Sequence, residues 1–245
     1  MLLSLCSIAL LPLASLRVNA TSLTGVINTS EATGSPAVNV AAVEQVHTTN
    51  RRDLADTVAG AKNPREESRR EIEEALKTYR ELAEKEPETY LPDFAATLND
   101  LGILDSDENR IEKARKEFEE ALKTYRQLAH KEPKIYLPYV AITLNNLGIL
   151  EGAGNRLEEA LKIYRELAQK ERETYLPYVA ITLNNLGLLY YDQNLFSDAR
   201  PSYNKALGIY RELASTNPET YLRYVAMTLN NLGLLYRGEN HCHIA

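Results

Sequence analysis

Aromatic residues other than tyrosine are scarce in this chain of 245 residues, which has no tryptophan and only three phenylalanines. Its 15 tyrosines all lie between Tyr79 and Tyr236. Large aromatic side chains bury much of the apolar surface of a core. We therefore expect the folded core between these two residues, in a chain long enough for one or two domains.

Cysteine and histidine are also rare, with two cysteines and four histidines in the whole chain. Cys6 and Cys242 stand at opposite ends and cannot form a disulfide framework. Residues 241–243 read His-Cys-His, but three ligands with no fourth in view make a poor metal site. The sequence also lacks a nucleophile-and-base set, a glycine-rich phosphate loop and a paired-histidine helix motif. We therefore expect a protein that is no enzyme and holds no metal or cofactor.

An excess of positive charge is missing as well. The chain has 28 basic and 34 acidic residues, for a net charge of −6. Nucleic acid is bound through basic surfaces that neutralise phosphates. The charge balance therefore disfavours nucleic acid as a partner.

The N-terminal apolar stretch, Leu2 to Leu16, is too short for a membrane-spanning helix, so no stable membrane span is expected. Its length matches the hydrophobic region of a secretory signal, and residues 18–20 (Val-Asn-Ala) fit a cleavage site. We expect a signal peptide at residues 1–20 and an exported protein, periplasmic or secreted. Because no lysine or arginine precedes the apolar stretch, a cytoplasmic protein remains the alternative.

Residues 21–62 are rich in Ser, Thr, Val, Ala and Asn and contain no aromatic residue. They show no sustained hydrophobic period either. Such a composition cannot bury enough apolar surface to fold, so this segment is predicted to be a disordered linker.

Two sequence motifs recur from residue 63 onward. One reads Ala-Leu-Lys-Thr-Tyr-Arg-Glu-Leu-Ala in its first copy, and its copies begin at Ala75, Ala121, Ala160 and Ala206. The other, Thr-Leu-Asn-Asn-Leu-Gly, begins at Thr143, Thr182 and Thr228, with a diverged copy at Thr97. The spacing between copies is 46, 39 and 46 residues, which is typical of a helical repeat array.

Apolar residues within the copies recur every three or four positions, as Phe118, Leu122 and Tyr125 do, and this period predicts helices. Two sets of prolines divide the helices. We interpret Pro87, Pro133 and Pro218 as stop signals, and Pro92, Pro138 and Pro177 as first-turn residues of the next helix.

The third copy lacks seven residues between Gly148 and Ala160. Seven residues are close to two helical turns, so this loss rotates an apolar stripe by only about 20°. We therefore expect Leu157 to stand where Phe118 stands in the longer copy.

These repeats resemble the tetratricopeptide repeat, particularly the long-helix variety of kinesin light chains. In that family helix A carries Leu, Gly and Tyr, and helix B carries Ala, an aromatic residue and Ala. The matching residues here are Leu101, Gly102, Ala114, Phe118, Ala121, Leu147, Gly148, Ala160, Tyr164, Leu186, Gly187, Tyr190, Ala199, Tyr203, Ala206, Leu232, Gly233 and Tyr236. One departure is Asp105, which stands where tyrosine is usual.

The resemblance implies an all-α fold, a right-handed α-solenoid of about three to four tetratricopeptide-type helix pairs over residues 63–237. Residues 238–245 are expected to be a frayed tail. A glycine inside a helix costs about 1 kcal/mol relative to alanine. Its recurrence in every copy indicates that helices approach closely there, with large side chains opposite.

The resemblance also implies a concave surface, lined by the A helices, that binds an extended peptide or a partner helix. Within it we single out Asn146, Asn185 and Asn231, because a carboxamide can both donate to and accept from a peptide backbone. Asp100 takes the same place in the first copy and favours an N–H group or a cation. Tyr191 is a further groove candidate. The alternative is that these asparagines tie neighbouring A helices together, or face water.

The function predicted from these features is a scaffold that binds a peptide or partner protein in the concave groove. A second reading is a self-associating structural repeat protein. It rests on Leu229, Leu232, Leu235 and Tyr236 in the last helix A, which no following helix B covers. A fragment of a larger multidomain regulator is a further alternative.

Overall fold

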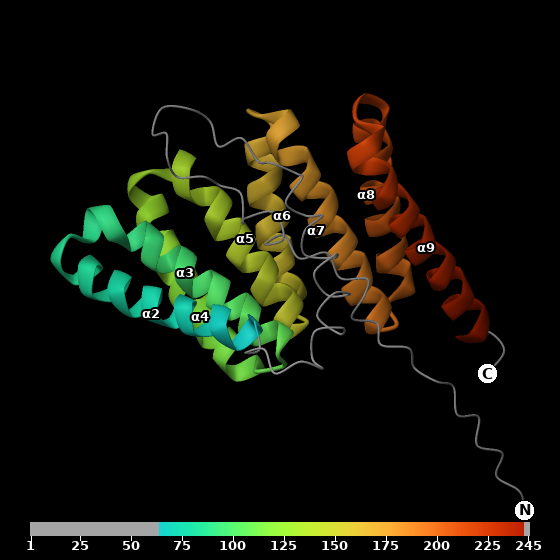
Figure 1. Ribbon diagram of the computed structural model, residues 1–245. Helices are drawn as coiled ribbons and strands as arrows, with labels where there is room; N and C mark the ends of the chain where they lie inside the picture. Colours follow the sequence, from blue (N-terminus) through green and yellow to red (C-terminus); the bar gives the residue numbers. More distant parts are fainter. Residues whose placement is uncertain (1–63, 243–245) are drawn as a thin grey trace, which may run out of the picture.

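The computed structural model describes residues 64–242, so the signal peptide and linker expected at residues 1–62 lie outside the described residues. This part of the chain is entirely helical (Figure 1). Its helices are α2 (Pro64–Lys85), α3 (Pro87–Asp107), α4 (Ile111–Lys131), α5 (Pro133–Glu151), α6 (Gly154–Ala168), α7 (Arg172–Asp192), α8 (Phe196–Thr216) and α9 (Pro218–Cys242).

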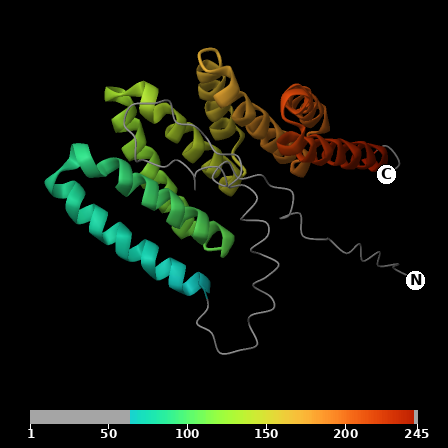
Figure 2. The ribbon, with the colours of Figure 1, turned by 45° about the horizontal axis from the view of Figure 1, so that its top comes forward.

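The helices form a two-layered solenoid, which confirms the all-α architecture. Each helix packs against the next along the chain, and α3, α5, α7 and α9 also contact one another in that order. Figure 2 shows the helix pairs following an arc. Because neighbours lie closer together on the inside of a curve, α3, α5, α7 and α9 form the inner layer. The remaining helices, α2, α4, α6 and α8, form the outer layer.

The two sets of prolines have roles different from those predicted. Pro87, Pro133 and Pro218 are the first residues of α3, α5 and α9, where a missing N–H costs no hydrogen bond. Pro92, Pro138 and Pro177 lie inside α3, α5 and α7, about one turn further from the start of the helix. The prediction placed the helix starts too late, because either proline suits a first turn when only the sequence is considered.

Close contacts at the repeated glycines hold each inner helix against its outer partner. A Cβ atom on Gly102 would lie 2.8 Å from Phe118, and one on Gly187 would lie 2.6 Å from Tyr203. On Gly148 it would lie 2.6 Å from the Leu157 side chain. The expected close approach is therefore confirmed at these three glycines but not at Gly233, where no described atom lies within 4 Å of a Cβ position. Leu157 does occupy the place of Phe118.

The missing residues of the third copy come from both sides of its helix connection. Outer helix α6 has 15 residues, whereas α4 has 21. Inner helix α5 is also shorter, since it ends at Glu151 soon after Gly148 and is capped by Gly152 in the left-handed conformation. The loss therefore leaves the contact between Gly148 and Leu157 intact.

Stacked tyrosines join the outer helices α4, α6 and α8 to the next inner helix. The ring centroids are 5.1 Å apart for Tyr125 and Tyr139 and for Tyr164 and Tyr178, and 5.2 Å apart for Tyr210 and Tyr224. Each outer-helix tyrosine in these pairs is almost completely buried. Tyrosine therefore supplies the aromatic bulk of the core, as the composition predicted.

Carboxylates replace the family tyrosine in the first two inner helices, and arginines from both neighbouring segments bind them. Asp105 is 1% exposed and forms ion pairs with Arg69 of α2 and with Arg110, the latter at 2.8 Å. Glu151 pairs in the same way with Arg115 at 3.3 Å and Arg156 at 2.6 Å. Ion pairs to neighbouring segments therefore take the place that Tyr190 and Tyr236 have in the later copies.

Helix α9 continues to Cys242, through part of the segment predicted to be a frayed tail. Two contacts with α8 account for the extra length. Glu239 forms an ion pair with Arg200, and a Cβ atom on Gly238 would lie 3.3 Å from the Phe196 ring.

Candidate partner-binding surface

A ladder of buried asparagines connects the inner helices. The second asparagine of each pair donates from Nδ2 to Oδ1 of the first asparagine in the preceding inner helix. The donor–acceptor pairs are Asn146 with Asn99 at 3.2 Å, Asn185 with Asn145 at 3.2 Å and Asn231 with Asn184 at 3.1 Å. The ladder fixes both the spacing of the inner helices and the orientation of each accepting amide.

The asparagines singled out from the sequence are therefore the donors of this ladder. Asn146, Asn185 and Asn231 are 4%, 3% and 2% exposed, which places them between neighbouring inner helices. The structure gives these three residues the tying role that the sequence analysis left open as the alternative. An amide in this position holds the inner surface in shape from below.

Asp100 differs from its three counterparts because no inner helix precedes α3 among the described residues. Its side chain is exposed to solvent. It nevertheless lies in the hollow of the inner surface, where surrounding protein atoms displace bulk water. This desolvation raises the pKa of Asp100 to about 6. Of the four residues at this position, Asp100 is the one whose side chain is exposed.

Tyr191 lies near the connection between α7 and α8. Its ring centroid is 5.8 Å from that of Phe196, and a Cβ atom on Gly238 would approach its ring to 3.4 Å. These contacts pack Tyr191 against α8 and α9. Its role in a groove stays a prediction.

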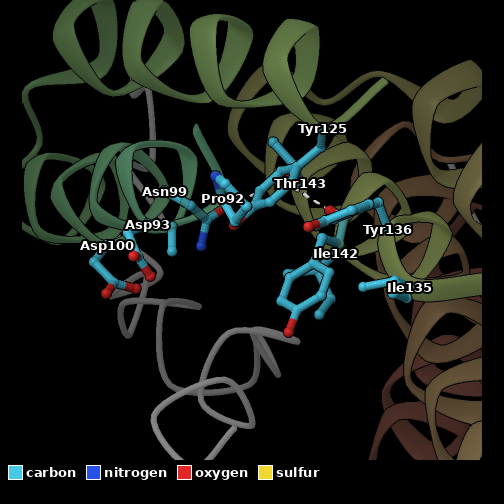
Figure 3. A pocket seen from close by; sticks show the side chains of 11 residues that line it. Pro92, Asp93, Asn99, Asp100, Tyr125, Ile135, Tyr136, Ile142 and Thr143 are labelled. Atoms are coloured by element: carbon cyan, nitrogen blue, oxygen red, sulfur yellow. Dashed lines mark hydrogen bonds between the residues drawn. The ribbon is translucent and has the colours of Figure 1, made fainter. Parts of the chain in front are cut away.

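A cavity of about 220 Å³ opens on the inner surface between α3 and α5 (Figure 3). Asp93, Asn99 and Asp100 line it from α3, and Ile135 and Tyr136 line it from α5. The rest of the lining is Pro92, Ala96, Tyr125, Tyr139, Ile142 and Thr143. The cavity combines carboxylates on one side with aromatic and aliphatic walls on the other.

Asn99 presents a free donor to this cavity. It is 4% exposed, and its Oδ1 atom already accepts the hydrogen bond from Asn146. Within residues 64–242 its Nδ2 atom has no hydrogen-bond partner, and in Figure 3 this nitrogen points toward the open space beside the carboxylates. In Asn145 and Asn184 the corresponding Nδ2 atoms also lack a hydrogen-bond partner among the described residues, but they are buried and cannot be reached from the inner surface.

Negative charge surrounds the α5 side of the cavity as well. Partial burial raises the pKa of Tyr136, and the nearby carboxylates Glu132, Asp93 and Glu88 raise it further. An anion entering here would meet the same repulsion that opposes ionisation of the tyrosine.

Sequence reasoning ranked the preceding Asn99 below Asp100, and it missed Asp93 and Tyr136. A signal for Asp93 was present, because Tyr139 and Tyr178 occupy the corresponding position in the next two copies. The first copy thus departs from the repeat twice, at Asp93 and Asp100, and both departures place a carboxylate on this cavity. The role of Asn99 depends on which amide donates in the ladder, and the sequence does not contain that information.

Among residues 64–242 no group of three or more His, Cys, Asp or Glu side chains is placed to hold a metal ion. None of the helices α2 to α9 combines the length and the apolar character needed to cross a membrane.

Comparison with known families gives two matches, both to models described as tetratricopeptide repeat, over residues 94–129 and 139–212. No curated protein matches the chain. Among solved structures, the chain is similar to BtubC (BKLC) from P. vanneervenii, with 24% sequence identity and a TM-score of 0.50. The similarity covers 71% of this chain and 66% of BtubC, slightly under two thirds of that protein. At this identity the likeness concerns the fold.

Proposed function

Because the chain belongs to the tetratricopeptide repeat family, we propose that it is a protein–protein interaction scaffold that holds an extended segment of a partner on its inner surface. Repeats of this family generally mediate interactions between proteins. The proposal gives this chain the same role, as a scaffold without catalytic activity of its own.

One observation carries the proposal: the cavity between α3 and α5 has an amide donor fixed by the ladder and no described group to accept from it. The Nδ2 atom of Asn99 can be reached from the cavity, although the residue as a whole is only 4% exposed. A backbone carbonyl of an extended peptide would satisfy Asn99 whatever the side chain of that peptide residue. Half-exposed Ile135, at 50%, would pack against the same peptide.

Filling the cavity tests this role. Ala96 lines the cavity, so Ala96→Trp should block it and reduce partner binding at least about tenfold, while circular dichroism and melting stay near wild type. Gly208→Trp is the matched control, because nothing lies within 4 Å of that position on outer helix α8. A photoreactive residue placed at position 135 of this chain crosslinks the bound partner, and the yield of crosslinked complex measures binding. Equal binding by Ala96→Trp and wild type would contradict the proposal.

A second function, self-association, is favoured by the uncovered face of α9. Leu222 and Leu229 are 56% and 44% exposed, whereas their counterparts in α7, Leu176 and Leu183, are 7% and 4% exposed. Of the other residues expected to be uncovered, Tyr236 is exposed, but Leu232 and Leu235 are buried against α8. Among the described residues nothing lies within 4 Å of a Cβ atom on Gly233, where the other inner helices receive a large side chain. The face therefore has the shape that receives an outer helix.

Helix α2 has the complementary shape. It is an outer helix with no inner helix before it among the described residues, and Ile72 stands where Phe118 contacts Gly102 in the next pair. We propose that α2 of a second copy packs on α9, continuing the internal repeat contact head to tail. Such a contact is heterologous and adds further copies at both ends.

Two variants test this stacking. Leu229→Glu spoils the α9 face and Ile72→Glu spoils the α2 face, so each alone should be monomeric in light scattering at high concentration. A mixture of the two should form a dimer, since each variant keeps one intact face. A symmetric contact between two α9 helices would leave Ile72→Glu associated, and a monomeric wild type would contradict self-association altogether.

Export remains a further proposal, supported by the apolar N-terminal stretch. Expression of the full chain in a secreting host, followed by sequencing of the N-terminus of the product, should give Thr21 as the first residue. An intact N-terminus in the cytoplasm would contradict it.

A further inference from the structure

We propose that the cavity between α3 and α5 takes a cationic side chain, arginine or lysine, of the partner segment held on the inner surface. This inference rests on the proposed scaffold function and adds the chemistry of the partner. A second outcome, in which the cation comes from this chain itself, is included in the test.

Two carboxylates that line the cavity form no ion pair with a described basic residue. Among the described residues no arginine or lysine forms an ion pair with Asp93 or Asp100. Carboxylates elsewhere in the same repeat do have such partners, as Asp105 does with Arg69. Figure 3 shows Asp93 and Asp100 at the same side of the cavity. A cation entering the cavity would be attracted by both carboxylates.

The wall opposite the carboxylates is aliphatic and aromatic. Ile135 and Tyr136 face the carboxylates across the cavity, and Tyr125 lies at its back. A long aliphatic stem would pack on these side chains while its charged head reaches Asp93 and Asp100. A guanidinium or ammonium group near a tyrosine ring gains a further attraction from the face of the ring.

The Asn99 amide would fix the position of the peptide backbone. Asn99 is almost completely buried, and the ladder bond from Asn146 fixes its amide so that Nδ2 is the free atom. A carbonyl bound to Nδ2 would hold the peptide backbone beside the carboxylates. The site therefore recognises a backbone carbonyl and a cation together.

The preference belongs to this repeat alone. At the position of Asp93 the following copies have Tyr139 and Tyr178, and at the position of Asp100 they have the buried Asn146 and Asn185. One basic residue would thus fix the register of an extended partner along the inner surface.

The test uses the full chain, labelled with ¹⁵N, and tripeptides with blocked ends. The probes are Ser-Arg-Ser, the same peptide with citrulline, which is isosteric but neutral, and Ser-Glu-Ser. Shifts of the Asn99 side-chain amide and of the α3 and α5 backbone report binding. We expect the arginine peptide to bind at least about fivefold more tightly than the citrulline peptide, and this preference to shrink in high salt.

The double variant Asp93→Asn/Asp100→Asn should remove the preference for arginine. Glu166→Gln is the matched control, because Glu166 is an exposed carboxylate on outer helix α6, and it should keep the preference. Both variants are first checked for a native amide spectrum, since Asn preserves the size of Asp.

Three outcomes would overturn the inference in different ways. Equal affinity for arginine and citrulline at the same residues contradicts the cation preference and leaves the scaffold function standing. No shift at the cavity with any peptide contradicts both. The predicted linker at residues 21–62 carries two adjacent arginines, Arg51 and Arg52, which are the candidate cations of this chain itself. If Arg51→Ala/Arg52→Ala tightens arginine binding at least about fivefold, this chain supplies the cation and the partner assignment falls.

Discussion

Single side chains at the start of the array differ from their repeat counterparts in their response to pH. Desolvation raises the pKa of Asp100 to about 6, above the value of about 4 that it has in an unfolded chain. The folded state therefore binds the proton more tightly, so the contribution of Asp100 to stability falls as the pH rises from 4 through 6.

The variant Asp100→Asn removes this ionisation. At pH 7 it should be more stable than wild type, by less than about 1 kcal/mol because solvent screens an exposed carboxylate. At pH 4 the difference should vanish. Urea unfolding at the two pH values measures it, and a variant that is less stable than wild type at pH 7 would show that Asp100 accepts a stabilising bond.

Glu117 of α4 is a second titrating residue. Burial raises its pKa to about 8, and the charge of neighbouring Asp105 and a hydrogen bond to it act in the same direction. Because the folded pKa lies above the unfolded one, stability should fall as the pH rises from about 5 to 8. Glu117→Gln keeps a donor for Asp105 without the charge.

This Gln variant should match wild type at pH 4 and exceed it by more than about 1 kcal/mol at pH 9. Denaturant unfolding across the pH range measures the difference. The control is Glu166→Gln on outer helix α6, which should change stability equally little at both pH values. A Glu117→Gln variant that follows the wild-type profile would exclude a shared proton between α3 and α4.

At the scale of the element, the period of the apolar residues and the repeated sequence motifs were sufficient to predict the helices and the glycine contacts. They predicted Leu157 opposite Gly148 correctly, because a contact repeated in three pairs depends only on spacing along two helices. They did not predict that α3 begins at Pro87. Nor did they predict that Asn99, rather than Asn146, presents its amide to the cavity, since that depends on how one inner helix sits against the next.

The glycine contacts also yield a matched pair of variants. Gly187→Ala places a methyl group 2.6 Å from the Tyr203 ring, and we expect overpacking to lower stability by about 1 to 2 kcal/mol despite the better helix propensity of alanine. Gly233→Ala, at the equivalent position of α9, meets nothing within 4 Å and should raise stability by up to about 1 kcal/mol. Thermal unfolding of both variants decides, and equal effects would mean that the ring of Tyr203 moves aside freely.

At the scale of the whole molecule, each helix depends on its neighbours along the array, so local stability should vary with position. Inner helix α7 has neighbours on both sides and a nearly continuous run of buried residues from Tyr175 to Leu188. Outer helix α2 has no fully buried residue, and α9 leaves Leu222 and Leu229 exposed. In a stack stabilised by contacts between nearest neighbours, opening begins at the less covered ends.

Native-state hydrogen exchange should therefore show the lowest opening free energies in α2 and α9 and the highest in α5 and α7. If copies stack head to tail, protection of α2 and α9 should rise with protein concentration while that of α7 stays constant. The mixture of Leu229→Glu and Ile72→Glu should protect one end of each partner only. Uniform protection from α2 to α9 at every concentration would mean that the array unfolds as a single cooperative unit, with no contribution from contacts between copies.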